Sequence, residues 1–165
     1  MRQAGINGVA DIPMIERIKV QQFILDRFID NIQRAPRPSI TDRTPLDMIG
    51  YMLGEVTMHN TPQELHEPIQ TYVDNCINAA ERYFDMALIV RPLPNYKVQD
   101  SRPPLNPAYQ TMVQFIIEGA GQNATQLYGG IIQTTDFEER CEATCGAIKR
   151  RLADLVRHKY GLTSH

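Results

Sequence analysis

The sequence predicts an all-α protein, a single domain of five or six helices joined by extended, proline-rich connections. Apolar residues recur every three or four positions along several segments of helical length. Capping side chains followed by proline, a frequent start of a helix, precede several of these segments. No segment of useful length combines period-two alternation with β-branched residues, as a half-buried strand would.

The size and composition of the chain fit a globular domain. It has 165 residues, with 17 Lys and Arg against 19 Asp and Glu, and a formal net charge of −2. The apolar content of 42% excludes general disorder, and the near-neutral balance excludes a protein that depends on bulk charge. We divide the chain into an N-terminal arm (1–11), a helical domain (12–160) and a C-terminal tail (161–165).

The apolar stripes and the prolines locate the helices. The stripes predict helices at about 12–34, 45–59, 62–90, 107–131 and 136–160. Two proline-rich loops, 35–43 and 91–106, separate them and should run extended over the surface. The fourth helix is expected to break near Gly121 and to restart at a cap on Asn123, because each glycine weakens a helix by about 1 kcal/mol.

Capping signals fix the expected helix starts. The capping residues that precede a proline are Thr44, Thr61 and Asn106. In addition, Thr61 with Glu64 and Thr135 with Glu138 fit the reciprocal capping box, in which each side chain bonds a free backbone N–H of the other residue.

The centres of the stripes predict the core. The residues expected to be buried on this basis are Ile77, Phe84, Ile148 and Leu152. Cys141 and Cys145 lie one turn apart, in register with the apolar residues of the last helix, and Cys76 lies in the third stripe. All three cysteines are therefore expected in the core as small apolar residues.

Three cysteines and the absence of a signal sequence predict reduced thiols. Residues 1–10 contain no apolar block typical of a secretory signal. The longest strongly apolar run, 86–90, is far shorter than the roughly 20 residues that cross a bilayer, so no membrane insertion is expected. We expect the protein in the cytoplasm, or within a particle that is assembled there.

A weak metal-site candidate consists of Glu55, His59 and His66. Glu55 and His59 are four residues apart and share a helix face, and imidazole with carboxylate suits a transition metal. The spacing matches neither His-Glu-x-x-His nor the di-iron Glu-x-x-His element. We therefore expect no metal and no cofactor, and a metal-dependent helical enzyme is the third hypothesis for function.

The end of the last helix is basic, which supports a second hypothesis, a helical nucleic-acid-binding protein. The residues of this basic cluster are Lys149, Arg150, Arg151, Arg157 and Lys159. Binding to phosphates needs clustered charge and not a positive net charge. Stability alone also explains the cluster, because basic residues near a C-terminus are favoured by the helix dipole.

The first hypothesis is a non-enzymatic structural or assembly subunit of a larger homo- or hetero-oligomeric complex, for example a virion or another particle. The sequence has neither the phosphate-binding glycine loop nor the Gly-x-Ser-x-Gly nucleophile turn. The proline-rich arms are expected to make the contacts, because proline-rich segments are already extended and lose little entropy on docking. The apolar residues that a protein partner would bury are Leu93, Tyr96, Val98 and Leu105.

Overall fold

The structure is a computed structural model that describes residues 12–93 and 106–161. The elements in this part of the chain are α1 (Met14–Arg34), α2 (Pro45–Met58), the short 3-10 helix η2 (Gln63–Leu65), α3 (His66–Tyr83), β1 (Ala87–Val90), α4 (Pro107–Asn123), β2 (Tyr128–Ile132) and α5 (Phe137–Tyr160). Helix predominates, which confirms the predicted class, and a small two-stranded sheet is added to it.

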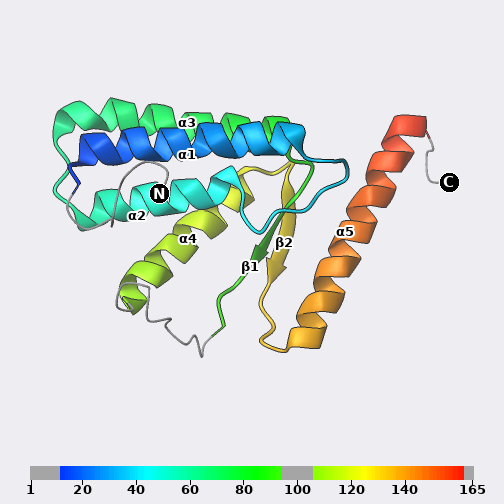
Figure 1. Cartoon of the computed structure of the whole chain (residues 1–165). Coiled ribbons are helices and arrows are strands. Elements are labelled where there is room, and N and C mark those ends of the chain that lie inside the picture. The colour runs from blue at the N-terminus through cyan, green and yellow to red at the C-terminus, as the bar shows by residue number, and fades with distance from the viewer. Residues whose placement is uncertain (1–11, 94–105, 162–165) are drawn as a thin grey trace.

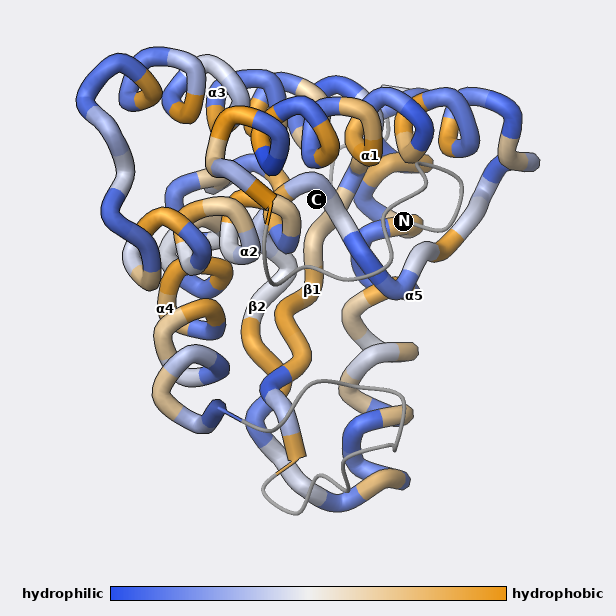
Figure 2. The backbone as a smooth tube through the Cα atoms, turned by 60° about the vertical axis from the view of Figure 1, so that its left-hand side comes forward, coloured by the Kyte–Doolittle hydropathy of each residue, from blue (hydrophilic) through white to orange (hydrophobic). Residues whose placement is uncertain are grey.

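The helices form layers. Helices α1 and α3 lie side by side, α2 lies beneath them, and α4 packs across α2 (Figure 1). The two strands lie between α4 and α5, and α5 stands on the far side of the strands from α4 (Figures 1 and 2). The main body is therefore built from α1 to α4, with α5 at its edge.

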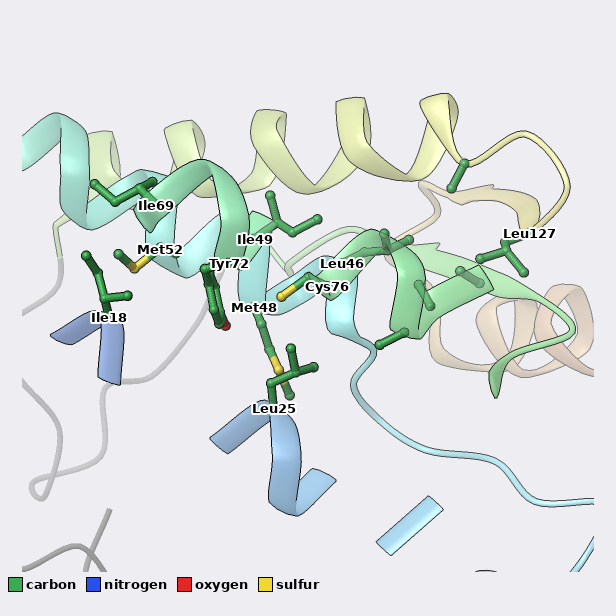
Figure 3. Packing of buried hydrophobic residues seen from close by; sticks show 14 of the residues in the cluster. Ile18, Leu25, Leu46, Met48, Ile49, Met52, Ile69, Tyr72, Cys76 and Leu127 are labelled. Carbon is green, nitrogen blue, oxygen red and sulfur yellow. The ribbon is translucent and has the colours of Figure 1, made fainter. Parts of the chain in front are cut away.

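The core lies where α1, α2 and α3 meet (Figure 3). Its most deeply buried side chains are Leu25, Met52, Tyr72 and Cys76, each no more than 1% exposed. Burial of Cys76 confirms the prediction for that residue. Removal of this apolar surface from water stabilises the body by roughly 25 cal/mol for each Å².

Two glycines let α2 and α4 approach closely. A Cβ at Gly54 would lie 2.8 Å from Cγ2 of Val113, and a Cβ at Gly50 would overlap the side chain of Ile117. Since real Cβ contacts are not this short, a larger residue at either position would push the helices apart.

Helix starts follow the predicted chemistry in two of four places. Thr44 and Asp47 form a complete capping box at the start of α2, and the Asn106 side chain accepts a bond from the backbone N–H of Tyr109 at the start of α4. The predicted box of Thr61 and Glu64 is wrong, because Pro62 precedes η2 and the Thr61 hydroxyl has no hydrogen-bond partner.

The other mistaken cap lies before α5. The prediction placed a box at Thr135 and Glu138, whereas Asp136 caps the helix and accepts a bond from the backbone N–H of Glu139 at 2.9 Å. Asp136 is as good a cap as threonine, and it stands one residue closer to the first helical turn.

The parallel pairing of β1 and β2 was not predicted. Ala87 pairs with Tyr128 and Val90 with Ile132, and α4 forms the connection between the strands. Buried parallel strands are continuous apolar runs without alternation, so the run that ends in Val90 was assigned to the end of the third helix. The strand stops where Pro92 follows.

Helix α4 is continuous through the glycines, so the predicted break near Gly121 is wrong. A Cβ at Gly121 would lie 2.6 Å from Cδ1 of Ile89. The glycine therefore allows α4 to pack closely on β1, and packing offsets its weak helix propensity. The chain leaves the helix after Asn123 and enters β2 at Tyr128.

Several residues predicted in the core lie elsewhere. Leu152 is 42% exposed and Ile77 is 36% exposed, whereas Phe84 and Ile148 are half-buried. Cys141 and Cys145 are exposed. For the residues of α5 the reason is that this helix contacts mainly β2 and does not enter the core of α1 to α3.

The described segments contain no helix that is both long enough and apolar enough to cross a membrane.

Candidate functional site

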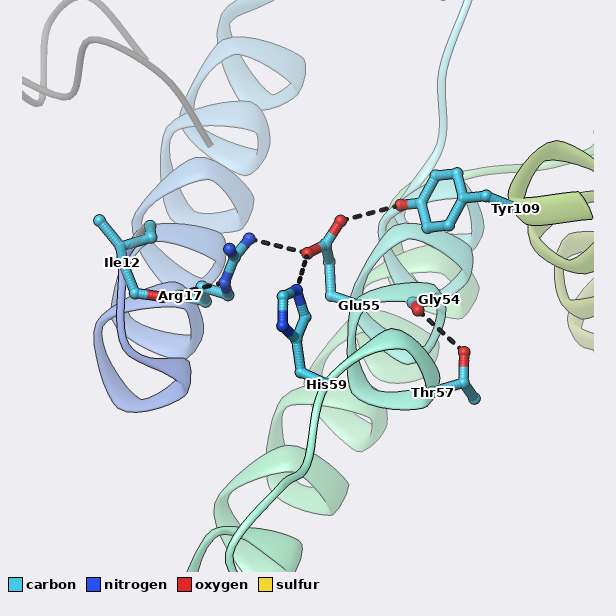
Figure 4. Close-up of polar contacts among 7 residues, drawn as sticks. All are labelled: Ile12, Arg17, Gly54, Glu55, Thr57, His59 and Tyr109. Atoms are coloured by element: carbon cyan, nitrogen blue, oxygen red, sulfur yellow. Dashed lines mark hydrogen bonds and ion pairs between the residues drawn. The ribbon is translucent and has the colours of Figure 1, made fainter. Parts of the chain in front are cut away.

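Glu55 joins three helices through its carboxylate (Figure 4). Arg17 Nη1 on α1 lies 2.7 Å from Oε2 of Glu55 on α2, and His59 Nε2 lies 3.3 Å from the same oxygen. The Tyr109 hydroxyl on α4 donates to Oε1 at 3.1 Å. Both oxygens are therefore engaged within the chain, which gives Glu55 a structural role at a helix junction.

Burial and the neighbouring charge act together on this junction. Burial raises the pKa of the Tyr109 hydroxyl, and the adjacent Glu55 carboxylate raises it further, so the tyrosine stays a neutral donor. Arg17 is 6% exposed, and its Nε also donates to the backbone oxygen of Ile12 at 3.1 Å.

The structure separates the members of the weak metal-site candidate. Glu55 and His59 lie together, whereas His66 begins α3 as an exposed residue. Across residues 12–93 and 106–161, no three or more His, Cys, Asp or Glu side chains are grouped as a metal site would require.

A second ion pair, which the sequence analysis missed, fixes the end of β1 on α4. Arg91 Nε and Nη2 each donate to a different oxygen of Glu118, both at 2.8 Å. The Gln114 amide donates to the same carboxylate at 2.8 Å. The hydrogen bonds from Arg91 lower the pKa of Glu118, which is the ordinary effect of a charged donor pair.

The basic residues of α5 surround the helix. Lys149, Arg150 and Arg151 are consecutive, and consecutive helical positions are about 100° apart. Arg151 Nε donates to the backbone oxygen of Asp85 at 2.8 Å, and Arg157 lies 3.4 Å from Asp154. The cluster therefore does not line up on a single face, and one of its members is used to hold α5 on the body.

The proline-rich segment is described only at its two ends. Leu93 is 47% exposed, in agreement with an apolar residue available to a partner. Tyr96, Val98 and Leu105 lie outside the described residues, so their predicted contacts stay predictions.

Helix α5 carries an apolar stripe of eight residues, of which six are exposed and two, Ile148 and Leu155, are half-buried. The stripe consists of Phe137, Cys141, Cys145, Ile148, Leu152, Leu155, Val156 and Tyr160. The exposed fractions of Phe137, Val156 and Tyr160 are 76%, 50% and 65%. We call these eight residues the α5 stripe.

The side of α5 that carries Arg140, Ala147 and Arg151 faces the body. Ala147 is the only buried residue of this 24-residue helix. Arg140 donates to the backbone oxygen of Arg91, and Arg151 donates to that of Asp85, so two arginines attach the helix at either side of Ala147. Within the chain, Ile148 and Leu155 are half-buried, and the other six residues of the α5 stripe are exposed.

Figure 2 shows α5 apart from the main helical layers, with hydrophobic and hydrophilic residues following each other along it. A monomer seldom leaves so long an apolar strip in water.

The chain was also compared with known proteins. No significant match was found among protein-family models, curated proteins or solved structures. A function for this chain therefore rests on its own surfaces.

Proposed function

We propose that this chain is a non-enzymatic subunit of an oligomeric assembly and that the α5 stripe is its main contact surface. The observation that carries the proposal is the exposure of six of the eight stripe residues, from Phe137 at the start of this long helix to Tyr160 at its end. Assembly in the cytoplasm belongs to the same proposal.

The energetics of α5 support a partner. Most helices in proteins are stabilised by packing of an apolar face, because intrinsic propensity alone is marginal in water. Helix α5 buries one alanine on its own chain and carries Gly146 in its interior, where glycine costs about 1 kcal/mol relative to alanine. Burial of the stripe against another subunit would supply the missing stabilisation.

The proline-rich segment remains a second contact in this proposal. Leu93 is exposed where the chain leaves β1, beside the Arg91 and Glu118 ion pair that holds this point of the backbone. A fixed anchor point lowers the entropy that a docking segment loses.

The molar mass in solution tests the proposal. Light scattering across protein concentrations from about 1 to 100 μM, the usual range of moderate association, should show a species of more than one chain. Leu152→Glu places a charge in the stripe and should shift the species towards the monomer. Ala143→Glu is the matched control, because it adds the same charge at an exposed position on the side of α5 away from the stripe and should leave the mass unchanged.

A monomer throughout this range overturns the proposal. Equal effects of Leu152→Glu and Ala143→Glu would place the contact elsewhere than the stripe. The same sample gives the ratio of absorbance at 260 and 280 nm, and a ratio that falls with added salt would favour the nucleic-acid hypothesis instead.

A further inference from the structure

We propose that the partner of the α5 stripe is α5 of a second copy, packed antiparallel to it about a two-fold axis near residues 148 and 149. This inference rests on the proposed function and adds to it the identity and the orientation of the partner. Three observations support it.

The α5 stripe is nearly symmetric about its own centre. From Phe137 seven of its eight residues, all except Leu155, follow in steps of four, four, three, four, four and four, ending at Tyr160. Reversal of the helix about the midpoint brings Phe137 opposite Tyr160, Cys141 opposite Val156, and Cys145 opposite Leu152. A two-fold interface requires a surface that is complementary to itself, and this stripe places an apolar residue opposite an apolar residue in these three pairs, whereas Ile148 lies opposite Lys149 and Leu155 opposite Glu142.

The charges of α5 favour the antiparallel orientation. Residues 136–142 contain four carboxylates and one arginine, whereas residues 149–159 contain five Lys and Arg and one aspartate. An antiparallel pair places the acidic start of each helix beside the basic end of the other, with Glu138 opposite Lys159. A parallel pair would place like charges side by side, which disfavours that alternative.

The attachment of α5 to its own body leaves room for a second helix. The bonds of Arg140 and Arg151 to the backbone and the buried Ala147 occupy one side of the helix. Cys141 follows Arg140 and Leu152 follows Arg151, so each of these stripe residues lies about 100° around the helix from an arginine that contacts the body. A second α5 therefore meets the stripe without displacing the body.

Cross-linking through cysteine distinguishes the orientations in the full-length protein. All variants carry Cys145→Ser. The two variants that introduce a new cysteine, Ile148→Cys and Val156→Cys, also carry Cys141→Ser. The central variant Ile148→Cys should form a disulfide with its own copy under mild oxidation, because both Ile148 positions lie at the two-fold axis. Chains that keep Cys141 as their only cysteine in the stripe, with Cys76 buried, should not link to each other, because the two Cys141 positions are separated by about 22 Å along an antiparallel pair.

The mixture of two chains gives the positive result that only an antiparallel pair produces. Chains that keep Cys141 are mixed with size-tagged chains that carry Val156→Cys, and the two should link as a heterodimer. Linking of Cys141 to itself overturns the antiparallel orientation. If light scattering shows a multi-chain species but Ile148→Cys forms no link, a second α5 is not the partner, and the proposed function still stands. A monomer overturns both.

Discussion

Replacement of Leu25 with alanine tests the described core directly. Leu25 is 1% exposed and lies where α1 meets the other two core helices (Figure 3). Because almost none of this side chain reaches water, the substitution loses nearly the whole transfer free energy and leaves a cavity. Leucine-to-alanine changes of this kind cost 2–5 kcal/mol, so full burial between three helices predicts about 3–4 kcal/mol. In a domain of this size that corresponds to a fall in Tm of about 10 °C.

Urea denaturation followed by circular dichroism measures the free energy of unfolding, and an unchanged m-value shows that the change is in stability alone. Leu152→Ala is the comparison, because Leu152 is 42% exposed within one chain. In dilute protein its loss should be no more than about 1 kcal/mol. A cost below 1 kcal/mol for Leu25→Ala, or equal costs for the two variants in dilute protein, would refute the described division between core and α5.

Three further predictions concern caps, close packing and titration. Thr44→Ala should lower the free energy of unfolding by about 1 kcal/mol, because it removes a capping box. Thr61→Ala should change the free energy of unfolding by less than about 0.5 kcal/mol. Equal losses in the two variants would contradict the assigned caps. Gly54→Ala should destabilise the protein, since the new Cβ meets a side chain of α4, whereas Gly119→Ala, which meets no atom within 4 Å, should stabilise it by roughly 0.5–1 kcal/mol; the reverse order would show that α2 and α4 are not in close contact. Burial raises the pKa of the Cys76 thiol to about 11 from an ordinary 9.0. The stabilisation that comes from this protonated thiol is therefore complete below pH 9 and is lost as the pH rises from 9 to 11. If the free energy of unfolding falls over this range no more than it does in Cys76→Ala, this prediction is contradicted.

The sequence predicted those features that depend on local chemistry. The helical class, the cap at Thr44 and the start of α4 at Asn106 each follow from a few neighbouring residues. The strands were missed because a buried parallel strand and a buried helix segment have the same apolar composition. Their pairing depends on contacts between residues about 40 positions apart, which no local pattern shows.

The candidate site was predicted only in part, for the same reason. The periodicity of the last helix is visible in the sequence and grouped Cys141, Cys145, Ile148 and Leu152, but it assigned them to the core of the same chain. Periodicity cannot tell whether a stripe such as that of Leu152 packs on its own chain or on another, because both need the same pattern. The Arg91 and Glu118 pair lies 27 positions apart and became visible only in the folded chain.

The labelling rate of Cys141 and Cys145 with a maleimide, measured against protein concentration, tests the central claim most directly. Both thiols are exposed in the α5 stripe of one chain, and Cys76 is buried and serves as the internal reference. If the stripe is covered by another subunit, the two exposed thiols react rapidly in dilute protein. At concentrations where light scattering shows an assembly, their labelling rate should fall by a factor of about ten or more. A tenfold fall corresponds to a shift of about 1.4 kcal/mol towards the covered form. Equally rapid labelling at every concentration would show that the stripe remains open to water and would contradict the account.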